Sequence, residues 1–152
     1  MKVYVDTSVI GGCLDEEFKE WSVRLIAEFS AGRKVAVISD LTQGEIDPAP
    51  PAVRAILDGI PASGREAVSL GVEARALADT YLRDGVVASD SLLDALHIAV
   101  ATVARVDVLV SWNFKHIVNL RRIRLYNAVN MKMGYGILDI RSPREVLDEE
   151  DA

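Results

Sequence analysis

The chain has 152 residues, of which 50% are hydrophobic and 26% are charged, with a formal charge of −6 at pH 7. This composition is typical of a globular protein and excludes a disordered or collagen-like chain, while the length suits one domain with a single core. Uninterrupted apolar runs reach only about four residues, whereas a membrane-spanning helix needs about twenty, so no membrane association is predicted.

Residues 1–5 are apolar and rich in β-branched side chains, which predicts a buried strand that ends at Asp6. A carboxylate at this position interrupts the apolar stretch that a secretory signal requires. The single cysteine, Cys13, has no partner for an internal disulfide and is expected to be a small packing residue. Both features lead us to expect a cytoplasmic protein.

Strands and helices are predicted to alternate along the rest of the chain. After a polar loop and a flexible break at 11–12, apolar residues recur with helical spacing over 18–29, and Gly32 ends this helix. The later elements, in order, are a strand at 35–38, a short helix containing Glu45, a short helix at 52–57, a strand at 67–70, a helix at 74–82, a helix at about 89–105, a strand at 106–110, a helix at about 114–131, a strand at 137–140 and a helical turn starting at Pro143.

This alternation predicts an α/β fold, a three-layer α/β/α sandwich around a central, mainly parallel sheet whose strands are buried on both faces. We expect residues 1–147 to form this one domain and 148–152 to be a solvated acidic C-terminal tail. Right-handed crossovers place the C-terminal ends of parallel strands along one edge of the sheet. In open α/β folds this edge holds the ligand site.

Three acidic residues are predicted to meet at that edge. Asp6 ends the first strand, Glu45 lies in the helix after the second, and Asp94 lies in the first turns of a later helix. Taken alone, Asp94 could simply complement the positive end of a helix dipole. At about 5 Å and an effective dielectric of about 20, each pair of like charges would cost about 3 kcal/mol. Bound divalent cations, shared protons or a cationic partner must therefore offset the repulsion.

The donor atoms indicate which metal ion these acids would bind, and the charge distribution indicates which kind of substrate. A set of carboxylate oxygens suits Mg²⁺ or Mn²⁺, and the sequence has no Cys/His cluster of the zinc type. Residues 108–138 contain five basic and no acidic side chains, so this stretch carries +5 and the remainder −11. A basic surface beside a carboxylate pocket suits metal-assisted hydrolysis of a phosphodiester, although the basic residues could equally form a solvated helix face.

Four segments carry a resemblance to a known family: 3–8 (VYVDTS), 39–46 (SDLTQGEI), 94–99 (DALHIA) and 109–117 (LVSWNFKHI). In this order they resemble the successive motifs of PIN-domain proteins, among which the VapC-like toxins of bacteria and archaea are the nearest branch. The resemblance extends from residue 3 to about residue 147. It implies a metal-dependent endoribonuclease on a compact α/β/α sandwich, commonly a homodimer and commonly inhibited by a small antitoxin protein.

In this resemblance Asp6, Glu45 and Asp94 match the acidic metal-binding positions, and Ser8 matches a small polar residue that supports them. Asn113 stands where many PIN domains have a fourth acid. A neutral oxygen donor would weaken a second metal site. Our hypothesis is therefore one tightly held Mg²⁺ with a weaker second ion that depends on the substrate.

Other polar residues near these positions have two interpretations. Asp90 precedes Asp94 by one helical turn, so it could be a fourth ligand or the N-cap of the helix, and capping is the simpler role. His97 has apolar neighbours in sequence, which favours a hydrogen-bonded core histidine over a general base. Either Ser39 or Asp40 can cap the helix of Glu45, and Asp40 is expected to cap it or else to support the site from outside.

Aromatic and basic residues around Asn113 are candidates for RNA contacts. Trp112 and Phe114 could stack on bases, with core packing expected for at least one of them. The basic side chains that could hold phosphates are Lys115, His116, Arg121, Arg122 and Arg124.

These observations favour a Mg²⁺-dependent endoribonuclease without a covalent nucleophile, which by resemblance would be the toxin of a type II toxin–antitoxin pair. The alternative is a catalytically degenerate PIN-like domain that binds RNA or a protein partner without cleavage, as the departure at Asn113 permits. A phosphotransferase of the haloacid-dehalogenase type would need a second aspartate where Ser8 stands. The glycines at 11–12 match neither a dinucleotide-binding pattern nor a P-loop.

Overall fold

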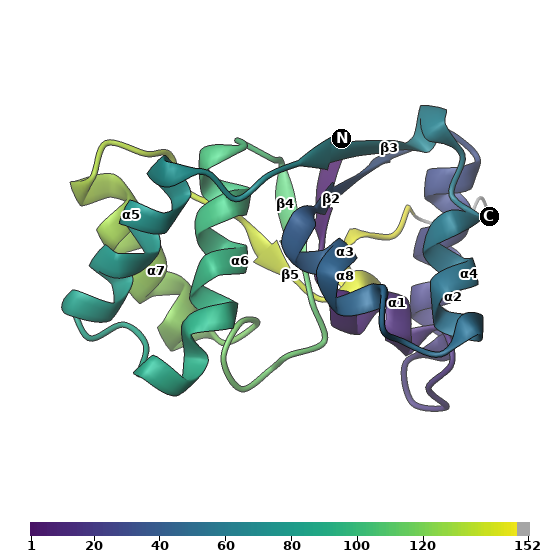
Figure 1. Ribbon diagram of the computed structural model, residues 1–152, viewed down its shortest axis with the longest axis horizontal. Helices are drawn as coiled ribbons and strands as arrows, with labels where there is room; N and C mark the ends of the chain where they lie inside the picture. The colour runs from purple at the N-terminus through teal and green to yellow at the C-terminus, as the bar shows by residue number, and fades with distance from the viewer. Residues whose placement is uncertain (149–152) are drawn as a thin grey trace.

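Five parallel strands form the central sheet of the computed structural model, which describes residues 1–148 (Figure 1). The strands are β1 (Lys2–Val5), β2 (Val35–Ser39), β3 (Arg65–Val68), β4 (Val108–Val110) and β5 (Ile140–Arg141). Their order is β3-β2-β1-β4-β5, and every neighbouring pair is parallel. The first strand is therefore central, with Tyr4 in register with Val37 of β2 and Leu109 of β4.

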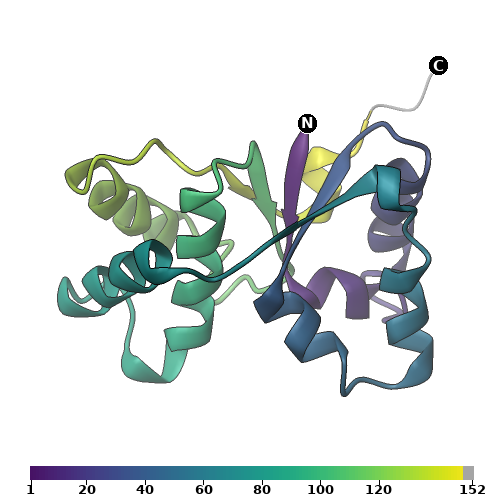
Figure 2. The same cartoon turned by 45° about the horizontal axis from the view of Figure 1, so that its top comes forward.

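Helices cover both faces of this sheet (Figures 1 and 2). One layer contains α5 (Val72–Arg83), α6 (Leu92–Val103) and α7 (Leu120–Lys132). The opposite layer contains α1 (Thr7–Gly12), α2 (Lys19–Ser30), α4 (Pro51–Asp58) and α8 (Pro143–Val146), while α3 (Asp40–Ile46) follows β2. Short 3-10 turns occur at η1 (Ala62–Gly64) and η2 (Ser89–Ser91). The predicted three-layer α/β/α sandwich is confirmed.

The alternation of side chains along β1 divides the core into two clusters. Tyr4 points into the cluster formed with α5, α6 and α7, whereas Val3 and Val5 point into the cluster formed with α1, α2 and α4. All three side chains are completely buried. A period of two along a strand buried on both faces produces this division.

The segment after β1 is a helix, α1, and the predicted polar loop is wrong. Val9 and Ile10 are buried against the core, and this packing stabilises α1. The helix has only six residues, so it is too short to show a periodic pattern in the sequence. Gly12 lies inside this helix and does not form the predicted flexible break. A Cβ atom at Gly12 would lie 2.6 Å from Ser22 Oγ and 2.8 Å from Trp112 Nε1, so close packing requires this glycine.

The predicted helix at 114–131 begins later, at Leu120. The side chain of Asn119 accepts a hydrogen bond from the backbone N of Arg122 and caps α7. Before it, the chain turns tightly, because the carbonyl of Asn113 accepts hydrogen bonds from the backbone N atoms of Ile117 and Val118. Capping by a local side chain thus separates a loop from a helix within the segment that was predicted to be one helix.

Two strands have bounds that differ from the prediction, and side chains of neighbouring elements account for the difference. The β3 strand ends at Val68, two residues before its predicted end, and Asp40 Oδ1 accepts a hydrogen bond from the backbone N of Leu70. The β5 strand contains only two residues, because the Asn127 side chain binds both the backbone N and the carbonyl of Leu138. Neither side-chain contact is visible in local sequence.

Lys34 connects the C-terminal segment to α2. Its Nζ donates to Glu28 Oε2 at 2.8 Å and to Asp148 Oδ1 at 2.5 Å, and the backbone N of Asp148 donates to Glu28 Oε1. Lys34 and Glu28 are buried, so each charge depends on the other. The other residues of the predicted tail, 149–152, lie outside the described residues. No helix within residues 1–148 is long and apolar enough to cross a membrane.

Replacing Gly12 with alanine should destabilise the protein by about 1–3 kcal/mol, because the new methyl group would collide with Ser22 and Trp112. The matched control is Gly11→Ala in the same helix, where a Cβ atom meets nothing within 4 Å. That change should be neutral or stabilise by up to about 1 kcal/mol. Urea unfolding measures both; equal stability of the two variants would contradict the packing role of Gly12.

Candidate active site at the C-terminal edge of the sheet

Asp6 is held in place at the end of the central strand. Its Oδ2 accepts hydrogen bonds from Ser8 Oγ at 2.7 Å and from Ser111 Oγ at 2.8 Å, and only 7% of the residue is exposed. Ser8 comes from α1 and Ser111 follows β4, so the two neighbouring segments both donate to this carboxylate. Asp6 Oδ1 accepts no hydrogen bond from residues 1–148, which leaves this oxygen available for a ligand.

A buried chain of hydrogen bonds positions Glu45. His97 Nε2 lies 2.7 Å from Glu45 Oε1, and His97 Nδ1 lies 2.7 Å from Tyr4 Oη. Tyr4 Oη in turn lies 2.7 Å from Ser39 Oγ, whose residue caps α3. An ionised carboxylate only accepts, so His97 carries a proton on Nε2 and donates it to Glu45. This hydrogen bond is the main cause that lowers the pKa of Glu45 below its usual value.

His97 is a buried, hydrogen-bonded histidine, as predicted, with 1% of its surface exposed. Its connection to the acidic site was missed. Its Nε2 also lies 3.8 Å from Asp6 Oδ1, so the imidazole stands between two of the three predicted acids. The spacing of Asp94 and His97, three residues apart on one helix, was the available signal.

Asp94 lies in the first turn of α6, where its side chain is half-buried. Burial, and after it the negative charge of Asp6, raises the pKa of Asp94 above its usual value, and Glu45 contributes in the same direction. Asn113 Nδ2 lies 3.5 Å from Asp94 Oδ1. The fold therefore places Asp94 within the electrostatic field of the other two acids.

These three acids do not form a closed metal cage. Among residues 1–148, no group of three or more His, Cys, Asp or Glu side chains is arranged to hold a metal ion. Magnesium is usually bound through one or two carboxylates and keeps several waters. The available Oδ1 of Asp6 and the raised pKa of Asp94 fit such a hydrated cation, because a positive charge there would relieve the repulsion between the two side chains.

The two other candidate acids lie differently from expectation. Asp90 is exposed in η2, and its Oδ1 accepts a hydrogen bond from Ser91 Oγ at 3.5 Å. The N-cap residue of α6 is Ser91, so the predicted capping by Asp90 is wrong. Of the two candidate caps of α3, Ser39 is confirmed, because its Oγ accepts a hydrogen bond from the backbone N of Thr42, and capping by Asp40 is wrong.

The predicted RNA-contacting residues divide into buried and exposed groups. Trp112 packs in the core, stacked on Phe18, with its Nε1 donating to Ser22 Oγ. Phe114 and Lys115 are exposed, and His116 is half-buried near Asp94. On α7, Arg121 and Arg124 are exposed, whereas Arg122 donates to the carbonyl of Val86.

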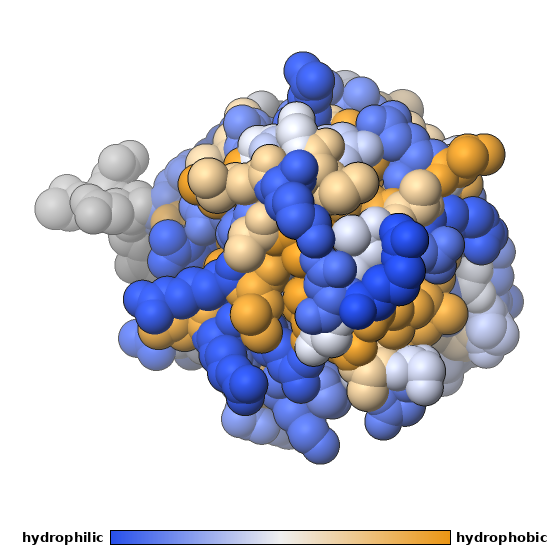
Figure 3. All heavy atoms as spheres, turned by 90° about the vertical axis from the view of Figure 1, so that its left-hand side faces the viewer, coloured by the Kyte–Doolittle hydropathy of each residue, from blue (hydrophilic) through white to orange (hydrophobic). Residues whose placement is uncertain are grey.

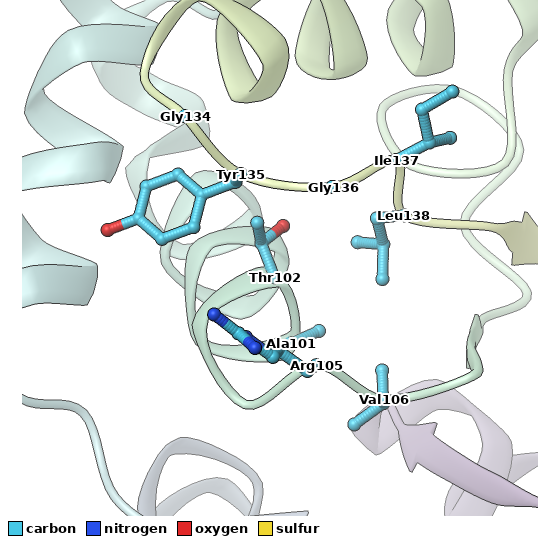
Figure 4. A pocket seen from close by; sticks show the side chains of 9 residues that line it. All are labelled: Ala101, Thr102, Arg105, Val106, Gly134, Tyr135, Gly136, Ile137 and Leu138. Atoms are coloured by element: carbon cyan, nitrogen blue, oxygen red, sulfur yellow. The ribbon is translucent and has the colours of Figure 1, made fainter.

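Two further features lie outside the candidate site. Burial raises the pKa of the Cys13 thiol to about 11, which keeps it protonated and agrees with a packing role. A cavity of about 350 Å³ opens between the C-terminal end of α6 and residues 134–138 (Figure 4). Its lining residues include Arg105 and Tyr135 and none of the three acids, which lie at the opposite end of α6 or of the strands.

The chain matches no protein-family model and no curated protein sequence. Its fold is similar to a chain in the crystal structure of VapBC2 from Rickettsia felis bound to a DNA fragment from their promoter. The TM-score is 0.58 with 14% identity, over 93% of this chain and 98% of the other. At this identity the similarity concerns the fold. Together with the sheet order, it defines the architecture as a PIN-like α/β/α sandwich.

Replacing Asp94 with asparagine should stabilise the metal-free protein at neutral pH. The folded state raises the pKa of Asp94, so the folded protein binds this proton more tightly, and stability falls as pH rises past the usual pKa of aspartate. The variant escapes this loss, and its advantage should disappear as pH falls below about 3.9.

Urea unfolding in EDTA at several pH values tests this expectation. The control is Asp90→Asn, an exposed neighbour whose replacement should change stability by no more than about 0.5 kcal/mol. An Asp94 variant that is less stable than the wild type at neutral pH would contradict the repulsion.

Proposed function

We propose that the protein is a Mg²⁺-dependent endoribonuclease that hydrolyses RNA phosphodiester bonds, with Asp6, Glu45 and Asp94 as its metal-binding acids. The observation that carries the proposal is the meeting of acids from three distant segments at the C-terminal edge of one parallel sheet. Open α/β sheets hold their ligands at this edge. The PIN-like fold and the resemblance of four sequence motifs support the same function.

The residues around the acids have distinct roles in this proposal. A bound magnesium ion would activate a water molecule and offset the charge of the phosphate. Ser8 and Ser111 donate to Oδ2 of Asp6 and fix its orientation, so its Oδ1 would be the atom that binds the ion. His97 donates to Glu45 and fixes its orientation, and the phenol of Tyr4, whose pKa is raised by burial, supports the imidazole from the other side. Such supporting partners strongly affect metal affinity in other proteins.

Asn113 bears on the number of ions. Its Oδ1 accepts a hydrogen bond from the backbone N of His116 at 3.0 Å, and its Nδ2 faces Asp94. The amide oxygen is thus engaged within its own loop. This supports one tightly held ion and a weaker second one.

A degenerate domain that binds RNA or a protein without cleavage is the second candidate. The neutral Asn113 and the open arrangement of the acids in residues 1–148 favour it. The two functions differ in one result, which is EDTA-sensitive RNA cleavage by pure protein.

The toxin role, the antitoxin partner, the homodimer and the cytoplasmic location stay predictions based on the sequence and its resemblance.

The face that includes α5 and α7 displays hydrophobic areas among hydrophilic side chains (Figure 3). Exposed apolar residues of α7 and the segment after it include Leu125, Met131, Met133 and Ile137. A second copy or a small protein partner would find apolar surface there.

Asp6→Asn should abolish EDTA-sensitive cleavage of single-stranded RNA. The loss of cleavage rate should exceed the roughly 10- to 100-fold that is typical when a residue that only supports metal ligands is replaced. Asp79→Asn, an exposed aspartate on α5, is the matched control and should cleave like the wild type. Thermal unfolding checks that both variants fold. Equal cleavage by the Asp6 variant would mean that the activity does not come from this site.

Asn113→Asp should increase the affinity for Mn²⁺ or the number of ions bound, because it places a carboxylate where the amide now stands. Calorimetric titration of the protein with Mn²⁺ measures both quantities without relying on activity. An unchanged affinity and stoichiometry would count against any role of position 113 in metal binding.

A further inference from the structure

Phe114 is an exposed aromatic ring backed by a rigid aromatic stack. Half of the residue is exposed, and its ring meets Trp112 edge-on with centroids 6.1 Å apart. Trp112 is stacked on Phe18 at 4.3 Å and is fixed by its hydrogen bond to Ser22. The ring of Phe114 therefore rests on a fixed surface while its other side faces solvent.

The loop that carries Phe114 is ordered beside the acidic site. The backbone N of Phe114 donates to the carbonyl of Trp112, and Asn113 accepts hydrogen bonds from three later backbone N atoms through its carbonyl and its side chain. The backbone N of Asn113 donates to Ser111 Oγ, which itself donates to Asp6. A ligand that meets Phe114 therefore loses little free energy to ordering of the loop.

The surroundings of Phe114 favour a nucleic acid base as its occupant. Its immediate neighbours in sequence are polar, with Asn113 facing Asp94 on one side and the exposed ammonium of Lys115 on the other. Phe114 is thus an exposed ring that is followed in sequence by a cation and carried on a loop whose Asn113 faces one of the candidate acids. Bases stack on such rings, and cations hold the adjoining phosphates.

We propose that Phe114 stacks on an unpaired base of the RNA substrate next to the candidate active site, while Lys115 contacts a neighbouring phosphate. This inference rests on the proposed function and specifies its substrate. Bases within a duplex are stacked on one another, so the substrate must be a single strand, a loop or a bulge. Carboxylates that bind a metal ion do not distinguish paired from unpaired strands, whereas stacking on Phe114 would favour an unpaired base.

Fluorescence anisotropy in EDTA, which prevents metal-dependent cleavage, tests the stacking with a fluorescein-labelled single-stranded RNA and the same strand annealed to its complement. Phe114→Ala and Phe114→Leu should weaken binding of the single strand by about 5-fold or more, since one stacked base contributes at least about 1 kcal/mol. Phe114→Trp should retain it. The duplex should bind all variants equally.

The matched control is Leu120→Ala, which removes an exposed apolar side chain of similar size at the start of α7 and should leave RNA affinity unchanged. Lys115→Ala should reduce the slope of log affinity against log salt concentration by about 0.7, the value for one phosphate contact on a single strand. The leucine variant at 114 separates stacking from hydrophobic bulk, and thermal unfolding confirms that each variant folds.

The outcomes distinguish this inference from the proposed function. Wild-type protein that cleaves RNA, with binding and KM unchanged in Phe114→Leu, would overturn the inference alone. A shift in molar mass or thermal stability of Phe114→Ala, without a change in RNA affinity, would assign the ring to a protein contact and also overturn it. Wild-type protein that shows neither RNA binding nor EDTA-sensitive cleavage would overturn both.

Discussion

Repulsion between acidic side chains at the C-terminal edge of the sheet is the constraint on which the candidate site depends. The fold brings Asp6, Glu45 and Asp94 close enough for their charges to interact, and hydrogen-bond donors offset part of the repulsion. Two hydroxyl groups donate to Asp6, and an imidazole N–H donates to Glu45. Asp94 Oδ1 lies 3.5 Å from the Asn113 amide nitrogen, and burial, followed by the charge of Asp6, raises the pKa of Asp94. A cation beside Asp94 would offset this repulsion.

The central strand connects this site to both halves of the core. Val3 and Val5 anchor β1 in one hydrophobic cluster, and Tyr4 anchors it in the other. Tyr4 also binds His97, so the orientation of Glu45 is supported from the central strand. A side chain held this way keeps its position without a ligand, which is the preorganisation that catalytic and binding sites require.

The sequence predicted the parts of this arrangement that follow from topology. A buried strand ending at Asp6 and a helix carrying Asp94 indicate a shared edge, because parallel strands end on the same side. The link from Tyr4 through His97 to Glu45 joins residues far apart in the chain, and periodicity carries no information about such contacts. The helix α1 was missed for a related reason, since packing against distant residues stabilises it.

In the proposed function, the loop at 113–118 links the charge of the site to recognition of the substrate. An aspartate at position 113 would add a negative charge beside Asp94, whose pKa is already raised by burial and, after it, by the charge of Asp6. The asparagine amide instead points a donor at Asp94 while its oxygen closes the turn with His116. This turn is what presents Phe114 to solvent beside the acids. In the proposed function, the neutral residue that would weaken a second cation site is therefore also the residue that orders the proposed base-stacking surface.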